Sequence, residues 1–290
     1  MKDKRISKTA SIVAAVRAKH RLYDSPIIFN DPWAIKLTSG FWRFVCGNRF
    51  LAACVFDTLL ADLRPAQASV LCRARFAEDA LERSLEKNIQ DYIILGAGLD
   101  SFALRRVGSM EALRVWELDA PTTQQYKKKL VMKLLSDMPA NLHYVPVDFE
   151  RQDFQASLVS SGFSKDVPAF FSILGLSYYI QERVFLEMMA TIANDFCSGT
   201  ELVVDIRVPK ECGDSCDFSR FEKIEKFTAR RGEQLVTQLN PEYFSNVAKG
   251  LGFELCEHLS PKMQRERYCQ GRDDGLSPTS EIHLFHFRVP

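Results

Sequence analysis

The sequence predicts an α/β protein with a doubly wound, mostly parallel sheet, and three observations lead to that prediction. From residue 91 onward, short apolar runs of strand length alternate with helical stretches, and glycines or acids end the runs. Strand, helix and strand in this alternation form a parallel sheet with helices on both faces. The chain of 290 residues is 46% hydrophobic and 26% charged, which is enough apolar material for one sizeable core.

Seven runs are predicted to be strands, namely residues 92–95, 113–116, 142–147, 169–174, 201–206, 253–259 and 281–289. Helices are predicted between them over residues 121–136, 150–160 and 182–195. The last run is dense in apolar residues and follows a stretch rich in glycine, serine and proline, so we expect a hairpin-like terminal strand at or near an edge. No repeat or linker interrupts the pattern, and we therefore expect a single domain over residues 1–290.

Residues 1–88 are expected to be a helical cap on the Rossmann-like core of residues 89–290. Apolar residues recur at helical spacing over 12–23, 41–60 and 73–85. Such a segment is too apolar to be a disordered tail, so most of these side chains must be buried. We expect the cap to fold over the carboxyl ends of the strands as a lid.

Charge and hydropathy exclude several classes of partner. The net charge of +1 provides no strong field for nucleic acid or an anionic membrane. The basic runs 127–129 and 265–267 are interpreted as solvated faces. No stretch reaches 18 uninterrupted apolar residues, and the basic N-terminus lacks the pattern of a secretory signal. We therefore expect a cytoplasmic protein with no membrane partner, and we leave its oligomeric state open.

The eight cysteines do not form the pattern of a secreted disulfide framework. Four of them offer a candidate zinc set, Cys212 with Cys216 and Cys256 with Cys269. Their spacing is looser than that of most structural zinc sites, so we expect reduced thiols and no metal.

The candidate site lies where the strands end, because ligands of open α/β sheets bind at the carboxyl ends of the strands. The first predicted strand runs into Gly96, Gly98 and Asp100, and the two glycines allow the backbone to approach a ligand closely. Ser101 follows, and the third glycine of the dinucleotide fingerprint is absent. This departure disfavours NAD.

Acids also end the next two strands. Glu117 and Asp119 end the second, where a carboxylate can accept hydrogen bonds from ribose hydroxyls. Asp148 ends the third, where it can accept from an adenine amino group while Phe149 lies against the ring. Helix capping is the alternative role for these acids, because helices are predicted to begin directly after Asp119 and near Glu150. The combination of three such strand ends favours an adenosyl cofactor.

Together these motifs resemble the leucine carboxyl methyltransferase family, and in particular its bacterial branch, which includes polyketide O-methyltransferases. The resemblance spans roughly residues 9–206. Its most specific part is Leu-Gly-Ala-Gly-Leu-Asp at 95–100, followed by Glu-x-Asp-x-Pro at 117–121. Shorter matches lie at 9–18, 31–34, 73–76 and 146–149.

The resemblance implies a class I methyltransferase-type fold and S-adenosyl-L-methionine as the cofactor. By position, Arg73 would hold the carboxylate of the cofactor, for which a guanidinium group is well suited, and Arg75 is the nearby alternative. Arg75 has a second interpretation, an ion pair with Glu78 or Asp79 on its own helix. The remaining positions that would contact the cofactor are Gly96, Gly98, Asp100, Glu117, Asp119, Asp148 and Phe149.

Leu174 departs from the family pattern, because the family places a glutamate before the Gly-Leu that here is Gly175-Leu176. The candidates for a catalytic role are Tyr178 and Tyr179, of which at most one is expected to face the site, and His20, if the lid brings it close to the substrate.

The resulting prediction is S-adenosylmethionine-dependent O-methylation of a small molecule, as in the secondary metabolism of the polyketide branch. The acceptor, a carboxylate or a hydroxyl, stays open; only a hydroxyl would benefit from a base. Two alternatives remain: a non-catalytic protein that binds S-adenosylmethionine, because of Leu174, and an NAD-dependent oxidoreductase, which Ser101 disfavours.

Overall fold

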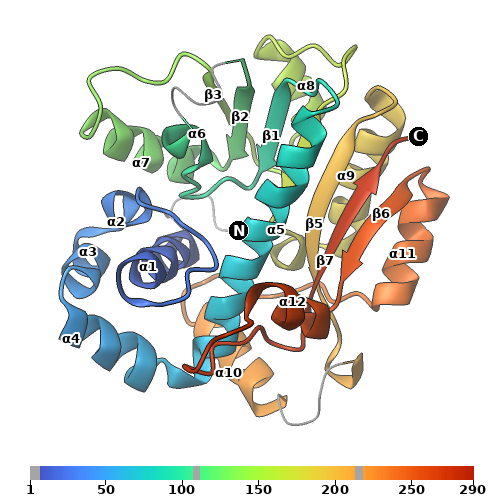
Figure 1. The fold of residues 1–290 in the computed structure, drawn as a ribbon. Helices are drawn as coiled ribbons and strands as arrows, with labels where there is room; N and C mark the ends of the chain where they lie inside the picture. The colour runs from blue at the N-terminus through green and yellow to red at the C-terminus, as the bar shows by residue number, and fades with distance from the viewer. Residues whose placement is uncertain (1–6, 107–111, 213–217) are drawn as a thin grey trace.

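A seven-stranded sheet forms the centre of the molecule in the computed structural model, which describes residues 7–106, 112–212 and 218–290 (Figure 1). The strand order is β3-β2-β1-β4-β5-β7-β6. The first five strands are parallel, whereas β7 runs antiparallel to both β5 and β6. This is the doubly wound α/β architecture that the alternation of runs predicted. The chain adds β2 and β3 on one side of β1 and then β4 and β5 on the other.

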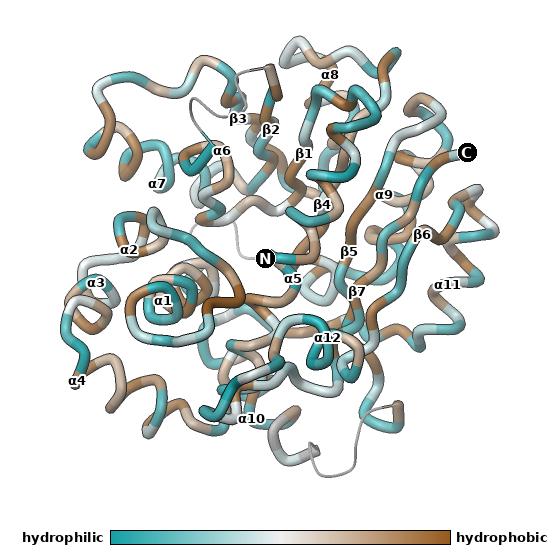
Figure 2. Tube along the Cα trace, in the orientation of Figure 1, coloured by the Kyte–Doolittle hydropathy of each residue, from teal (hydrophilic) through white to brown (hydrophobic). Residues whose placement is uncertain are grey.

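The strands are β1 (Asp91–Leu95), β2 (Arg114–Asp119), β3 (Leu142–Pro146), β4 (Phe170–Ile173), β5 (Glu201–Arg207), β6 (Glu254–Leu259) and β7 (Ile282–Arg288). Every residue of β1, β4 and β5 is buried, as expected for central parallel strands covered on both faces. Figure 2 shows the same strands as hydrophobic stretches of the chain. The predicted terminal strand β7 lies one position inside the edge, which β6 forms.

Two layers of helices cover the sheet. One contains α8 (Phe154–Ser160), α9 (Glu182–Asp195) and α11 (Pro241–Gly250), and the other contains α6 (Phe102–Arg105), α7 (Pro121–Met132) and the second half of α5 (Arg64–Leu85). Two further helices, α10 (Phe218–Ala229) and α12 (Pro261–Tyr268), lie in the last third of the chain, as does the short helical turn η4 (Lys210–Cys212). Another short turn, η3 (Ser177–Tyr179), follows β4.

The predicted cap consists of α1 (Lys8–Tyr23), α2 (Ala34–Leu37), α3 (Gly40–Cys46), α4 (Arg49–Ala52), η1 (Ala53–Leu59), η2 (Ala61–Leu63) and the first half of α5. These helices share a hydrophobic core of their own, which includes Val16, Phe29, Val45, Phe56 and Leu71. In Figure 1 they form a layer beside the sheet, and α5 runs from that layer onto the sheet. Of the residues that the structure describes, none belongs to a helix long and apolar enough to cross a membrane.

Two helix boundaries differ from the predictions, one of them where a polar side chain accepts hydrogen bonds from backbone N–H groups. The helix expected from residue 150 begins at Phe154, because the carboxylate of Asp153 accepts from the N–H groups of Gln155 (2.8 Å) and Ala156 (3.3 Å). The helix expected over 121–136 ends at Met132. The predicted solvated face at 127–129 is wrong for Lys127, which is 1% exposed.

Candidate functional site

Gly96 and Gly98 form the turn that follows β1, with φ values of 78° and 52°, a conformation that favours glycine. A Cβ atom on Gly98 would lie 3.3 Å from the Cβ of Ala10 on helix α1. The cap therefore covers this turn closely, and the narrow space beside it suits backbone contact with a ligand. Asp100 closes the turn by accepting from the Phe102 N–H at 2.7 Å.

Asp119, the last residue of β2, points across to the same turn. Its carboxylate accepts hydrogen bonds from the Gly98 N–H and from the Ala120 N–H, the latter at 2.6 Å. Ala120, not Asp119, occupies the N-cap position of α7, so the helix-capping alternative does not hold for Asp119. Burial raises the pKa of Asp119 to about 6, although the two N–H groups oppose that shift.

Glu117 lies two residues before Asp119 on β2, among the buried side chains under α7. Its carboxylate forms an ion pair of 2.5 Å with Lys127, and both side chains are nearly inaccessible. Burial raises the pKa of Glu117 to about 7. This buried pair is the physical reason why Lys127 leaves the solvated face that the basic run suggested. Its position makes Glu117 a structural support behind the turn rather than a direct ligand.

Asp148 and Phe149 follow β3 and line the cavity at the other side of the turn. Asp148 accepts from the Glu150 N–H at 3.1 Å within a local turn, while Asp153 caps helix α8. The capping alternative for Asp148 is therefore wrong. Its partly exposed carboxylate and the adjacent Phe149 ring both belong to the cavity lining, and the adenine role stays a prediction.

Arg73 enters the cavity from the middle of α5 and is held by residues from two strand ends. Its guanidinium donates to the Tyr178 hydroxyl at 2.5 Å and to the Asp205 carboxylate at 3.0 Å. Asp205 also accepts from the Gly175 N–H at 2.7 Å, and a Cβ on Gly175 would clash with the guanidinium at 2.6 Å. Asp205 and Tyr178 raise the pKa of Arg73, so its positive charge is permanent.

Asp205 was not among the site residues predicted from the sequence. The signal was a carboxylate in the otherwise apolar run of β5, at a position that is completely buried. A buried acid in a strand requires a partner, and Arg73 is that partner.

Arg75 lies on a different face of α5, with half of its side chain exposed and an ion pair of 2.6 Å to Asp79. The structure thus agrees with the second interpretation of Arg75, a local ion pair, and not with contact to the cofactor. The separation follows from helix geometry, because two residues along an α-helix point about 200° apart.

Arg17 of α1 links the cap to the glycine turn and was not a predicted site residue. Its guanidinium donates to the Leu99 carbonyl oxygen at 2.6 Å and lies 3.4 Å from Asp31 and 3.7 Å from Asp100. Asp31 accepts from the Ser101 hydroxyl at 2.7 Å. Ser101, in the place of the third glycine of a dinucleotide fingerprint, thus binds the cap.

His20 lies in the cap core, outside the cavity lining, which corrects the expectation that it approaches the substrate. It is 1% exposed, and both ring nitrogens have partners. Nδ1 lies 2.9 Å from the Asp24 carboxylate, and Nε2 accepts from the Ile28 N–H at 2.8 Å. His20 therefore stabilises the turn after α1.

Tyr178 and Tyr179 both line the cavity, so the expectation that at most one faces it is wrong. The expectation assumed an extended chain, whereas these residues belong to the 3-10 turn η3, in which neighbours are about 120° apart. Their ring centroids are 5.1 Å apart. Burial raises the pKa of both hydroxyls, so both stay protonated at neutral pH.

The cavity has a volume of about 300 Å³ and extends from the glycine turn to the inner face of the cap. Apolar side chains of the cap form one wall: Ile12, Val13, Val16, Phe56, Leu60, Leu63 and Val70. Leu174, in the position of the family glutamate, lies on the opposite wall after β4. The site is thus polar near the strand ends and apolar under the cap.

The cysteines considered for zinc are not gathered around this site. Cys212 and Cys256 are exposed and Cys269 is buried, while Cys216 lies outside the described residues. The described part of the chain contains no cluster of three residues able to hold a metal ion.

A Rossmann-like sheet with a glycine turn after β1, an acid ending β2 and an acid–aromatic pair after β3 defines a nucleotide-type cofactor site of the methyltransferase class. The chain belongs to the leucine carboxyl methyltransferase family, whose model matches residues 10–193. It is an S-adenosylmethionine-dependent methyltransferase, and the NAD alternative is set aside.

Two relatives illustrate the similarity. One is the "Putative S-adenosyl-L-methionine-dependent methyltransferase YktD" of Bacillus subtilis, 29% identical over 99% of both chains. A protein of Mycolicibacterium paratuberculosis with the same description is 32% identical over 65% of this chain and 63% of its own.

Solved structures show the same fold at low sequence identity. A "putative methyltransferase" from Thermobifida fusca has a TM-score of 0.62 at 17% identity, over 96% of this chain and 94% of its own. A DUF574 family protein from Streptomyces avermitilis has a TM-score of 0.60 at 13% identity, over 99% of each chain.

The shape and charge of the cavity lining are compatible with S-adenosylmethionine. A side chain at Gly98 would fill the space beside the turn, which only glycine leaves open. Asp119 directs a carboxylate, and Arg73 a guanidinium, into the lining of one cavity. These groups match a ribose and a carboxylate, respectively.

Proposed function

We propose that this methyltransferase methylates an oxygen atom, of a carboxylate or a hydroxyl group, on a small and largely apolar molecule. The observation that carries the proposal is the cavity wall formed by the cap, where apolar side chains of α1, η1 and α5 face the strand ends. Apolar walls with few polar groups are typical of sites for small organic ligands.

The cofactor, when bound, supplies an electrophilic methyl group for in-line displacement by the acceptor oxygen. The contribution of the chain is to orient the acceptor and to exclude water, and the cap wall serves both purposes. Tyr178 and Tyr179 keep their protons at neutral pH, so they do not act as bases. The Tyr178 hydroxyl already donates to Asp205 at 3.4 Å, which leaves Tyr179 as the one of the two that can donate a hydrogen bond to the acceptor. A carboxylate acceptor, which is already ionised at neutral pH, needs no base and suits this chemistry.

Arg73, Gly96, Gly98, Asp100, Asp119, Asp148 and Phe149 are the proposed cofactor-binding residues, since all of them line the cavity. Binding can be measured without a substrate. Adenosylhomocysteine should raise the melting temperature, because it binds only the folded chain, whereas NAD should leave it unchanged. A shift with NAD alone would contradict the cofactor assignment.

Turnover is tested with labelled S-adenosylmethionine and matched acceptors, such as an aromatic carboxylic acid, its methyl ester and the corresponding phenol. We expect transfer to the acid or the phenol and none to the ester, which lacks a free oxygen nucleophile. The alternative of a non-catalytic binding protein rests on Leu174, which places an apolar side chain where the family has a glutamate. Tight binding of adenosylhomocysteine without turnover across broad acceptor panels would favour that alternative.

A further inference from the structure

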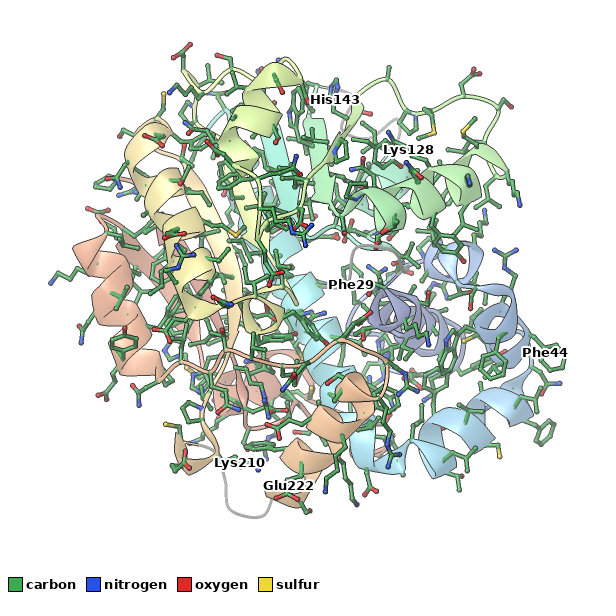
Figure 3. The ribbon with its side chains drawn as sticks, turned by 180° about the vertical axis from the view of Figure 1, so that it is seen from behind. Phe29, Phe44, Lys128, His143, Lys210 and Glu222 are labelled. Atoms are coloured by element: carbon green, nitrogen blue, oxygen red, sulfur yellow. The ribbon has the colours of Figure 1, made fainter. Side chains whose placement is uncertain are left out.

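The outer surface of the cap carries large apolar side chains that the catalytic site does not use. Phe41, Phe44, Phe50 and Leu59 are 65%, 70%, 87% and 73% exposed. They come from α3, α4 and η1, which follow one another along one rim of the molecule (Figure 1). Figure 3 shows Phe44 directed outward from that rim. Large apolar side chains exposed on successive helices of one rim indicate an interaction site.

The same segment carries positive charge and contains no acid. Residues 36–56 include Lys36, Arg43 and Arg49 but neither aspartate nor glutamate. Among the described residues, none of these three cations has a carboxylate within 4 Å. Lys36 lies 4.3 Å from the Trp33 ring, and Arg43 donates to backbone carbonyl groups of the α2–α3 turn. Their charges are therefore uncompensated.

The acids nearest along the chain already have partners. Asp31 pairs with Arg17 at 3.4 Å, Asp24 and Asp57 share Lys19 at 2.8 and 3.0 Å, and Asp62 pairs with Lys223 at 2.7 Å. Because Lys19 serves two carboxylates, one negative charge is left over against the three cations. The rim thus keeps a net positive charge, although the whole chain has a net charge of only +1. Phenylalanines interleaved with arginines fit the interface of a bilayer, where rings enter the acyl boundary and cations meet phosphate groups.

We propose that the surface formed by Phe41, Phe44, Phe50, Leu59 and the three basic residues 36, 43 and 49 docks on an anionic phospholipid membrane. A second copy of the chain is a poorer occupant. A symmetric dimer would place this positive surface against itself, and like charges would then oppose the contact. A phospholipid surface supplies both the opposite charge and the apolar layer. The expectation of no membrane partner used whole-chain charge, which hides this local imbalance.

The surface lies directly outside the catalytic cavity. Phe56, Leu60 and Leu63, from the same stretch of chain as the exposed residues, line the cavity wall. Docking would place that wall against the bilayer, where apolar molecules concentrate. This functional consequence rests on the proposed apolar acceptor, whereas the docking surface itself does not.

The experiment is sedimentation with vesicles of phosphatidylcholine, alone or with about one third phosphatidylglycerol, at low and high salt. The chain should sediment with the anionic vesicles, and high salt should weaken binding. The charge reversal Arg43→Glu/Arg49→Glu should weaken it at least tenfold, since each basic residue near such a surface contributes roughly fivefold. The triple variant Phe41→Ser/Phe44→Ser/Phe50→Ser should lose binding to the same extent.

Matched controls lie on the opposite side of the sheet. Leu255→Ser removes an exposed apolar side chain of β6, and Lys165→Glu/Lys249→Glu reverses two exposed charges. Both should bind like the unaltered chain, and all variants should keep its melting temperature. No sedimentation of the unaltered chain, or equal binding by the cap variants, would overturn the proposal. Concentration-dependent dimerisation lost in the triple variant, without vesicle binding, would assign the surface to a second copy instead. None of these readouts requires turnover, so failure here leaves the methyl-transfer proposal standing.

Discussion

The cap and the sheet face the same cavity, but they hold their polar residues in different ways. On the sheet, Asp119 is placed by its own strand and bonds to the turn that starts one strand away. In the cap, Arg17 is placed by the Leu99 carbonyl, 82 residues along the chain, and by Asp31 of the cap itself. The sheet itself fixes the position of a side chain at a strand end, whereas a side chain of a cap helix reaches its position only when the cap packs against the sheet. Variants that affect cap packing can therefore be compared with variants that affect ligand binding.

The largest effect should follow the loss of Arg17. Arg17→Met leaves the buried Asp31 with a weaker ion pair, to Arg105 at 3.7 Å, so we expect the free energy of unfolding to fall by about 3 kcal/mol. Arg183→Met, which removes an exposed pair with Glu187, is the control and should cost less than about 0.5 kcal/mol. Urea denaturation measures both. Asp31→Asn in the Arg17→Met background should restore part of the loss, and equal losses in all three variants would contradict the docking role.

Asp119 should affect binding more than folding. Asp119→Asn is expected to weaken adenosylhomocysteine binding by roughly 1.5–3 kcal/mol, the range for hydrogen bonds to a charged group. Isothermal titration should also show affinity falling as the pH drops through about 6, because the pKa of Asp119 is raised to about 6 and only the ionised carboxylate accepts two hydroxyl groups. Asp119→Asn should remove that dependence. Asp148→Ala, at a more exposed carboxylate, should cost less.

A pair of histidines at the sheet edge offers a test confined to the sheet. His258 and His283 share a hydrogen bond of 2.8 Å, and burial lowers the pKa of His283 to about 4. The unfolded chain binds this proton near pH 6.5 and the folded chain only near pH 4, so stability should fall as the pH drops between those values. Between these pH values, we expect the free energy of unfolding of the unaltered chain to fall by about 1–2 kcal/mol more than that of His283→Gln. Hydrogen exchange should quicken in β6 and β7 before it does in the cap; simultaneous exchange would contradict a local effect.

The smallest effect is expected at Arg75. Arg75→Ala should change stability by no more than about 0.5 kcal/mol and leave adenosylhomocysteine affinity unchanged, because Arg75 is half exposed and pairs with Asp79 on its own helix. Arg73→Lys, two residues away, should reduce affinity measurably. If both variants reduce affinity equally, the assignment of these two arginines is wrong.

The accuracy of the sequence predictions follows the same division between sheet and cap. All seven strands were predicted, and the five parallel ones were clearest, because buried parallel strands are short apolar runs with clear ends. The residues predicted at the glycine turn, Asp119, Asp148 and Phe149 all line one cavity, because strand ends converge at one edge of a parallel sheet. Three predicted site residues lie outside the cavity lining: His20 and Arg75 of the cap, and Glu117 of β2, whose side chain turns to Lys127.

The missed residues have one physical cause. Arg17 pairs with Leu99 and Asp31, and Arg73 with Asp205, over separations of up to 132 residues. Periodicity records which residues are buried but not which distant residue each one meets. The buried charges in apolar surroundings, Asp205 above all, were the only available signal.

The attachment of α1 bears on how the chain is made. Glu233 accepts from the N–H groups of Lys8 (2.9 Å) and Thr9 (3.3 Å), so a residue 225 positions later completes the first turn of the first helix. During synthesis α1 is made before the sheet, yet its amino end gains this partner only after the first five strands have been translated. Closing so long a loop costs entropy that local contacts do not repay. The amino end of α1 therefore gains its final attachment late, and we expect the apolar face of this helix to stay exposed until then.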